Sequence, residues 1–236
     1  MRLTFHDERV LAVVAHPDDA ELLCAGTLAR AAKDGAAIGI CVLCRGDKGQ
    51  PADLVENLGD VRSREMQAAA EILGGELLEG GIGDGELFDT FENRRMLIEM
   101  FRRFRPTLVI GHAMNDYHAD HRGASLLTEA ASWFCASRGH LSESTPLERP
   151  PVVWWMDTVN MIGFEPHLYV DISDFVELKR RMIRCHSSQL ARGDSSDFSP
   201  LEELMIQQST TRGGQSGVRA AEAFRHHEAW KRIGAW

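Results

Sequence analysis

The sequence has no run or stripe of basic residues. Acidic side chains outnumber Lys and Arg by 35 to 26 among the 236 residues, which gives a formal net charge of -9. A protein that binds nucleic acid needs clustered positive charge, because its affinity comes largely from displacing the counterions of the phosphates. The composition therefore argues against a nucleic-acid partner and favours a small-molecule partner.

Long apolar segments and a disulfide framework are also missing. No apolar run approaches the roughly 20 residues that span a bilayer, and the first nine residues lack the apolar stretch of a secretory signal, so we expect no membrane partner. The five cysteines are an odd number and are scattered along the chain. Cys41 and Cys44 lie three apart in a strand pattern and should point to opposite faces, so we do not expect them to act as a pair. Reduced thiols fit a cytoplasmic protein.

The chain does contain a regular alternation of strand and helix patterns. Its length suits one sizeable core, so we expect a single domain over residues 1–236. The order β-α-β predicts parallel strands joined by right-handed crossovers. Strand patterns cover 11–15, 37–43, 76–82, 107–112, 152–159 and 168–172, and helix patterns cover 20–33, 60–73, 91–104, 123–136, 175–189 and 201–208. A glycine-rich turn at 211–217 precedes an apolar segment at 220–224.

Ionisable side chains crowd the end of the first predicted strand. His16, Asp18, Asp19 and Glu21 follow it within six positions, where the helical pattern begins. Such a cluster costs desolvation and mutual repulsion unless something positive neutralises it, and no Lys or Arg lies nearby in the sequence. A divalent cation is the simplest candidate.

A second cluster of metal-capable side chains, at 115–122, follows the fourth predicted strand. Parallel strands end at one edge of the sheet, so the two clusters should converge there. His16, Asp19 and His121 would supply the three ligands of a mononuclear hydrolytic zinc site, although other divalent metals accept this set. Asp18 would take a proton from the attacking water, and His118 would stabilise an oxyanion or protonate the leaving group. Each cluster alone also fits an ordinary capped helix start, which is a weaker explanation for both together.

These residues resemble the motifs of the PIG-L/LmbE-like superfamily of metal-dependent N-deacetylases. The resemblance rests on His16-Pro-Asp-Asp-Ala-Glu21 and on His112-(x3)-Asp116-x-His118-x-Asp120-His121, and it continues through Arg62-x-x-Glu65 and Asp84-Gly85. It implies an α/β, Rossmann-like three-layer fold with a mostly parallel central sheet flanked by helices. It also implies a deacetylase that acts on N-acetylglucosamine units or related acetamido compounds, commonly with zinc (Zn²⁺), and releases acetate and a free amine.

The resemblance also assigns roles to individual residues. By position, the metal ligands are His16, Asp19 and His121, the general base is Asp18 and the electrostatic helper is His118. Further implied roles are the orientation of His118 or its neighbour by Asp120, sugar contacts by Arg62 and Asp84, and a buried functional pair of Arg62 with Glu65. Glu21 lies about two positions into the predicted helix, so we expect it to support a ligand or a nearby arginine. Oligomers are common among similar proteins, so we expect a homo-oligomer such as a trimer or hexamer.

Two departures from the family pattern and two alternative functions stay open. The usual His-Pro-Asp-His is His-Ala-Asp-His here, and the usual Thr-x-Gly after the second strand is Cys44-Arg-Gly46, which replaces a hydroxyl with a thiol. One alternative is an amidase that cleaves a thiol conjugate or a larger N-acyl compound, with substrate size set by the loops 81–88, 137–151 and 191–200. The other is a non-catalytic sugar-binding module, which would hold no stoichiometric metal.

Overall fold

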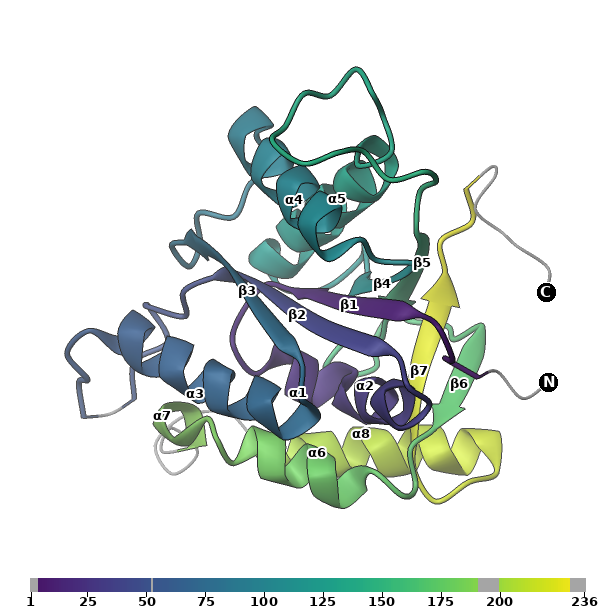
Figure 1. The fold of residues 1–236 in the computed structure, drawn as a ribbon. Coiled ribbons are helices and arrows are strands. Elements are labelled where there is room, and N and C mark those ends of the chain that lie inside the picture. Colours follow the sequence, from purple (N-terminus) through teal and green to yellow (C-terminus); the bar gives the residue numbers. More distant parts are fainter. Residues whose placement is uncertain (1–3, 52, 191–199, 230–236) are drawn as a thin grey trace.

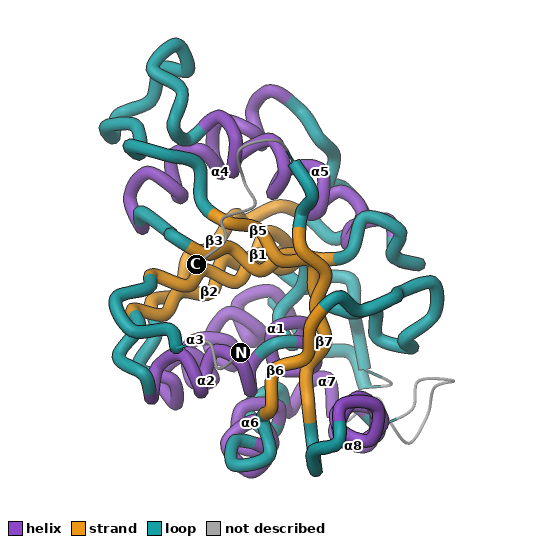
Figure 2. The backbone as a smooth tube through the Cα atoms, turned by 90° about the vertical axis from the view of Figure 1, so that its right-hand side faces the viewer, coloured by secondary structure: helices purple, strands orange, loops and turns teal. Residues whose placement is uncertain are grey.

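A single mixed sheet organises the protein, whose computed structural model describes residues 4–51, 53–190 and 200–229. Seven strands pair in the order β3-β2-β1-β4-β5-β7-β6 (Figures 1 and 2). Strands β1 to β5 are parallel, whereas β7 runs antiparallel between β5 and β6. The strands are β1 (Arg9–Val14), β2 (Ala37–Cys44), β3 (Glu76–Ile82), β4 (Leu108–His112), β5 (Val152–Met156), β6 (Leu168–Asp171) and β7 (Ala221–His226). The expected mostly parallel α/β architecture is confirmed.

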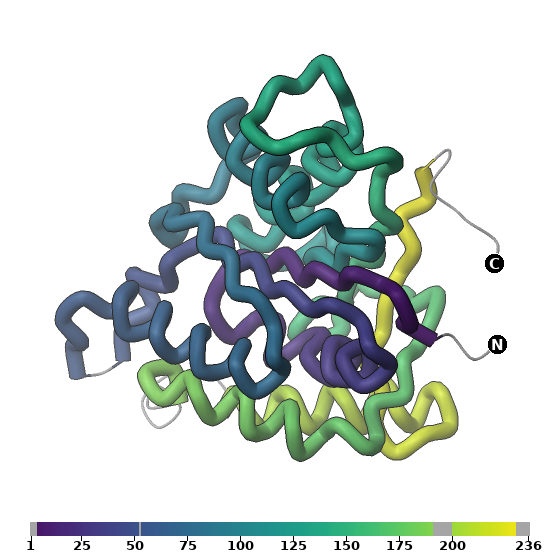
Figure 3. Tube along the Cα trace, in the orientation of Figure 1, coloured from purple at the N-terminus to yellow at the C-terminus, as the bar shows by residue number. Residues whose placement is uncertain are grey.

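Helices cover both faces of the sheet and complete three layers (Figure 1). One layer contains α4 (Phe91–Phe104) and α5 (Ala119–Phe134). The other contains α1 (Asp19–Leu23), α2 (Ala25–Lys33), α3 (Leu58–Leu73), α6 (Val176–Ile183), α7 (Ser187–Leu190) and α8 (Leu201–Ser216). Segments far apart in the sequence lie side by side here, because α1 packs against α8 and α2 contacts β7 (Figure 3). None of the helices in the described part of the chain is long and apolar enough to span a membrane.

Strand β1 shows why the apolar runs are continuous. Val10, Ala12 and Val14 pack into the core under α1, α2 and α3, whereas Leu11 and Val13 pack into the core under α4 and α5. Successive side chains of a strand point to opposite faces, so a sheet that is covered on both faces needs apolar residues at every position.

The topology determines where a site can form. Strands β2 and β3 lie on one side of β1, and β4 and β5 lie on the other side. The direction of strand succession therefore reverses between β1 and β4, and ligands of open α/β sheets bind at the carboxyl edge of this point. The register pairs Val14 with Val42 and Val13 with Gly111, so the segments that follow β1, β2 and β4 start side by side.

The helix predicted over 20–33 is in fact two helices. Cys24 separates them with φ of −144°. The Glu222 carboxylate accepts the N–H groups of Gly26 (2.9 Å) and Thr27 (2.6 Å), which caps the second helix. A buried acceptor far along the chain therefore ends one helix and starts another. The helix predicted over 175–189 is likewise divided into α6 and α7.

The prediction of a turn at 211–217 is wrong, because residues up to Ser216 belong to α8. The Arg212 guanidinium contacts the Asp157 carboxylate at 2.6 Å, with both side chains buried. A Cβ at Gly213 would lie 2.8 Å from the backbone of Ala220, so the glycine allows α8 to pack closely against the chain. Tertiary contacts therefore outweigh the low helix propensity of glycine.

The C-terminal apolar segment and the tryptophan-rich strand at 152–159 both belong to the central sheet. The segment at 220–224 lies largely in β7, which separates β5 from β6. Trp154 and Trp155 are buried, so β5 is a core strand and not an exposed interface. The predicted loop 191–200 lies outside the described residues except for its last residue.

Candidate functional site

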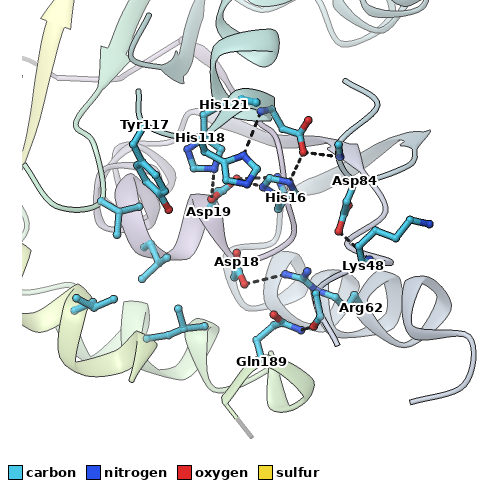
Figure 4. Close-up of a pocket in the computed structure, with 18 residues that line it drawn as sticks. His16, Asp18, Asp19, Lys48, Arg62, Asp84, Tyr117, His118, His121 and Gln189 are labelled. Atoms are coloured by element: carbon cyan, nitrogen blue, oxygen red, sulfur yellow. Dashed lines mark hydrogen bonds and ion pairs between the residues drawn. The ribbon is translucent and has the colours of Figure 1, made fainter. Parts of the chain in front are cut away.

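A cavity of about 540 Å³ opens at the switch point of the sheet. Figure 4 shows side chains from the ends of β1 and β4 meeting in it, with others from α3 and from the loop after β3. Eight of the ten residues singled out from the sequence line this cavity, namely His16, Asp18, Asp19, Arg62, Asp84, His118, Asp120 and His121. Glu21 and Glu65 do not line it.

The Asp19 carboxylate is the centre of the cluster. Its Oδ1 lies 3.3 Å from Nε2 of His121, and its Oδ2 lies 3.5 Å from Nδ1 of His16. Tetrahedral zinc with bonds of about 2.0–2.1 Å separates neighbouring donor atoms by about 3.3 Å. Each histidine nitrogen therefore lies at a ligand-to-ligand spacing from one oxygen of Asp19. In the described part of the chain, donor atoms within 4.8 Å of one another also group as His16, His118 and His121 and as Asp19, His112 and His121.

In both His16 and His121, the ring nitrogen that faces away from Asp19 contacts a second carboxylate. Nε2 of His16 lies 3.0 Å from Oδ2 of Asp120, and Nδ1 of His121 lies 3.0 Å from Oδ1 of Asp116. Such outer carboxylates fix the tautomer and direct the free nitrogen at a metal. The sequence prediction had Asp120 orienting His118 or a neighbour, and its side chain contacts the neighbour, His16. Asp116 belongs to the motif, but no role was predicted for it.

The charges in the cluster favour a divalent cation. Burial opposes a charged imidazole, but hydrogen bonds to Asp120 and Asp19 raise the pKa of His16 to about 10. Burial is likewise outweighed at His121, where Asp19 and Asp116 raise the pKa to about 9. Against the effect of burial, the hydrogen bond from His16 lowers the pKa of Asp120 to about 2. Without metal the carboxylates therefore hold two imidazolium protons, which one divalent cation can replace.

Two further histidines lie near the cluster, but each has one nitrogen engaged as an acceptor. Nε2 of His112 accepts the N–H of Ala15 at 3.0 Å, and burial lowers the pKa of His112 to about 4. Nδ1 of His118 accepts the N–H of Asp120 at 3.2 Å, and burial lowers the pKa of His118. In a neutral ring this arrangement places the proton on the other nitrogen, Nδ1 of His112 and Nε2 of His118. Nε2 of His112 also lies 3.3 Å from Oδ2 of Asp19, and its Nδ1 is buried without a hydrogen-bond partner among the described residues. A protonated nitrogen cannot bind a metal, but it can donate a hydrogen bond.

Asp18 is held beside the cluster by an arginine that is distant in the sequence. Its backbone has φ of 98°, in the left-handed region that a non-glycine residue adopts at a cost. Arg62 of α3 donates to Oδ2 of Asp18 at 2.8 Å, and it also donates to the carbonyl oxygens of Gly46 and Pro17. Burial raises the pKa of Asp18, and the guanidinium opposes this rise. Part of the positive charge that the sequence lacks near this cluster therefore comes from Arg62.

Asp84 joins two loops at the edge of the cavity. Its carboxylate accepts the N–H of Gly46 at 2.8 Å and the N–H of Lys48 at 3.1 Å. Both bonds tie the loop after β2 to the loop after β3. Asp84 therefore shapes the rim of the cavity.

Glu65 and Glu21 contact partners that the sequence did not predict. Glu65 accepts the N–H of Ser188 at 2.8 Å and also accepts both hydroxyls of Ser187 and Ser188, which fixes the start of α7. Within the described residues no hydrogen bond or ion pair joins it to Arg62, so a shared function of these two buried side chains stays a prediction. Glu21 lies 3.5 Å from Nε2 of His186, and both side chains are fully buried. This histidine, and neither a proposed ligand nor an arginine, is the partner of Glu21.

Comparison with known proteins identifies the family. The family model described as GlcNAc-PI de-N-acetylase, PIG-L, matches residues 11–132, which include both clusters. The chain belongs to this family of enzymes.

Three similar proteins show what the family contains. The chain is 29% identical over 234 residues to a diacetylchitobiose deacetylase of Thermococcus kodakarensis, with 94% of this chain and 84% of that protein covered. It is 28% identical over 197 residues to a 4-oxalmesaconate hydratase of Pseudomonas putida, with 76% and 73% covered. Among solved structures, the conserved protein TT1542 of Thermus thermophilus superimposes with a TM-score of 0.81 at 31% identity and 97% coverage of both chains. A hydratase is among these relatives, so membership in the family does not by itself determine the reaction.

Proposed function

We propose that this protein is a zinc-dependent N-deacetylase, which hydrolyses the acetamide of a small N-acetylglucosamine-type substrate to acetate and a free amine. One observation carries the proposal most directly. The cavity that His16, Asp19 and His121 line is also lined by Asp18, whose carboxylate Arg62 holds, and by His118, whose Nδ1 accepts the N–H of Asp120. Amide hydrolysis needs a base for water and a donor for the oxyanion, and this arrangement offers both.

The proposed zinc ligands are Nδ1 of His16, the Asp19 carboxylate and Nε2 of His121. His112 and His118 are left out, because each accepts a backbone N–H with one nitrogen and carries a proton on the other. Three protein ligands leave one position open, as in catalytic zinc sites, and other divalent metals tolerate the same set. Zinc bound here would polarise the acetamide carbonyl and make water more acidic.

The chain's own residues then move the protons. Asp18 accepts a proton from the attacking water, and Arg62 keeps its carboxylate in place. His118 donates from Nε2 to the oxyanion that forms on the acetamide carbon. Asp18, now protonated, or His118 delivers a proton to the departing amine.

Substrate contacts are proposed for Arg62 and Asp84. Both line the cavity, and Asp84 shapes its rim through Gly46 and Lys48. The cavity volume of about 540 Å³ lies within the range of roughly 300–1,000 Å³ that is usual for small-molecule sites. A small soluble sugar derivative is therefore a suitable substrate.

An apolar side of the same cavity supports a second candidate. Leu22, Val159, Leu201 and Leu204 line it. Such a surface suits an N-acyl group larger than acetyl, or a thiol conjugate, as substrate of an amidase. Release of amine from a series of N-acyl glucosamines of increasing acyl length distinguishes the two, because the deacetylase is fastest with acetyl and the amidase with a longer chain.

Replacement of the proposed base tests the proposal. Asp18→Asn should keep stoichiometric zinc, because Asp18 is not a proposed ligand, and should lower the rate of acetate release by about 10²–10⁴-fold. Asp174→Asn is the matched control, since Asp174 is an exposed acid that pairs with Arg219 outside the cavity. Near-normal acetate release by Asp18→Asn would contradict the assignment. A chain that binds no stoichiometric metal would favour the sugar-binding module. The homo-oligomer and the cytoplasmic location stay predictions.

A further inference from the structure

Cys44, which stands at the family's usual threonine position, is placed beside a proposed zinc ligand. It is the last residue of β2, and the register of β1 with β2 brings it next to the segment that carries His16. Its N–H donates to the carbonyl oxygen of Ala15 at 2.8 Å, which fixes its backbone. The side chain is only 2% exposed, and within the described residues its thiol has no hydrogen-bond partner.

The thiol completes a second set of metal-capable donors. The donor atoms of Cys44, His16 and Asp120 all lie within 4.8 Å of one another. The ring nitrogen of His16 that contacts Asp120 is Nε2, on the opposite side of the ring from the nitrogen that faces Asp19. The set therefore lies on the outer side of His16 and includes neither Asp19 nor His121.

The chemistry of this set differs from that of the proposed zinc ligands. A thiolate, an imidazole and a carboxylate suit thiophilic divalent cations such as zinc and cadmium. Burial raises the pKa of Cys44, and the negative charges of Asp120, Asp84 and Asp19 contribute to the rise. The same carboxylates attract a cation, whose charge favours loss of the thiol proton.

We propose that Cys44, His16 and Asp120 form a second, inhibitory site for a thiophilic divalent cation, which fills after the catalytic site. The inhibitory role rests on the proposed function, because it requires His16 to be a catalytic ligand. Binding releases two protons to solvent, one from Sγ of Cys44 and one from Nε2 of His16, and it takes the Asp120 carboxylate away from its hydrogen bond with His16. The His16 ring then bridges two cations, and their mutual repulsion weakens the binding of the catalytic ion.

Cadmium titration of the metal-stripped protein tests the proposal through the ultraviolet cadmium–thiolate charge-transfer band. The proposed catalytic set contains only nitrogen and oxygen donors, so the first equivalent should give no band. The second equivalent should give the band of one thiolate, and Cys44→Ser should abolish it. Cys41→Ser should retain it, because Cys41 is also buried in β2 but its sulfur packs against that of Met100.

Inhibition supplies an independent readout. In the zinc-loaded enzyme, we measure the concentration of excess zinc that halves the rate of acetate release. This concentration should be more than about tenfold higher in Cys44→Ser than in the unsubstituted enzyme, because loss of a supporting contact weakens a metal site by at least about that factor. Thermal unfolding and a retained silent first equivalent show that the variant is folded.

Each result decides between the proposals. Absence of a thiolate band, or an equal band in Cys44→Ser, overturns the second site and leaves the proposed function standing. A band with the first equivalent overturns both the second site and the assignment of the catalytic ligands. Excess zinc that inhibits Cys44→Ser and the unsubstituted enzyme equally overturns the inhibitory role.

Discussion

Replacement of Arg62 by methionine removes the group that holds the proposed base. The side chains of Arg62 and Asp18 are 4% and 13% exposed, and they are 2.8 Å apart. Loss of one partner from a buried ion pair costs about 3–5 kcal/mol, because the other charge stays behind without compensation. A domain has a total free energy of unfolding of about 5–15 kcal/mol, so Arg62→Met should remove a large part of it.

A double-mutant cycle separates the pair from the other contacts of Arg62. The hydrogen bonds to the carbonyl oxygens of Gly46 and Pro17 are lost in any background, whereas the orphaned carboxylate disappears in Asp18→Asn. Arg62→Met should therefore cost about 1–3 kcal/mol less in the Asp18→Asn background. Urea denaturation of the unsubstituted protein, both single variants and the double variant gives this difference. Equal costs in both backgrounds would refute the account of Arg62 as the partner of Asp18.

Three further predictions concern the support of the ligand His16, the oxyanion donor and the packing of α8. Asp120→Asn should weaken zinc binding about 10–100-fold, because an amide replaces the carboxylate that holds Nε2 of His16. Competition with a chelator measures the affinity, and an unchanged value would contradict the orienting role of Asp120. His118→Ala should lower kcat about 10²–10³-fold and leave zinc content unchanged, whereas loss of zinc would make His118 a ligand. Gly213→Val should lower the free energy of unfolding by about 1–3 kcal/mol or more in urea, since its Cβ would lie 2.8 Å from Ala220, and an unchanged midpoint would contradict the close packing.

Much of the sheet and the meeting of the two clusters could be predicted from local patterns. The strand and helix over 76–82 and 91–104 are found at those bounds. The convergence of His16 with His121 follows from a general property of parallel sheets, whose carboxyl ends share an edge. Local periodicity and topology were therefore enough to find the site.

The rest depended on contacts between residues far apart in the chain. Glu222 caps α2 from 195 residues away, and nothing in the helical pattern of 20–33 indicates that break. Arg62 and Glu65 are neighbours on α3, but one holds Asp18 and the other holds α7. The role of Asp116 depends on which nitrogen of His121 faces it, and a sequence motif does not contain that information.

Metal-dependent acetate release tests the central claim most directly. The protein is stripped of metal, zinc is added back in measured amounts, and acetate release from N-acetylglucosamine-type substrates is followed. We predict no release without metal and a rise that reaches its maximum at one zinc per chain, with a decline in excess zinc if the second site also fills. Full acetate release by the metal-free protein, or none with one zinc bound per chain across a panel of acetamido sugars, would contradict the account.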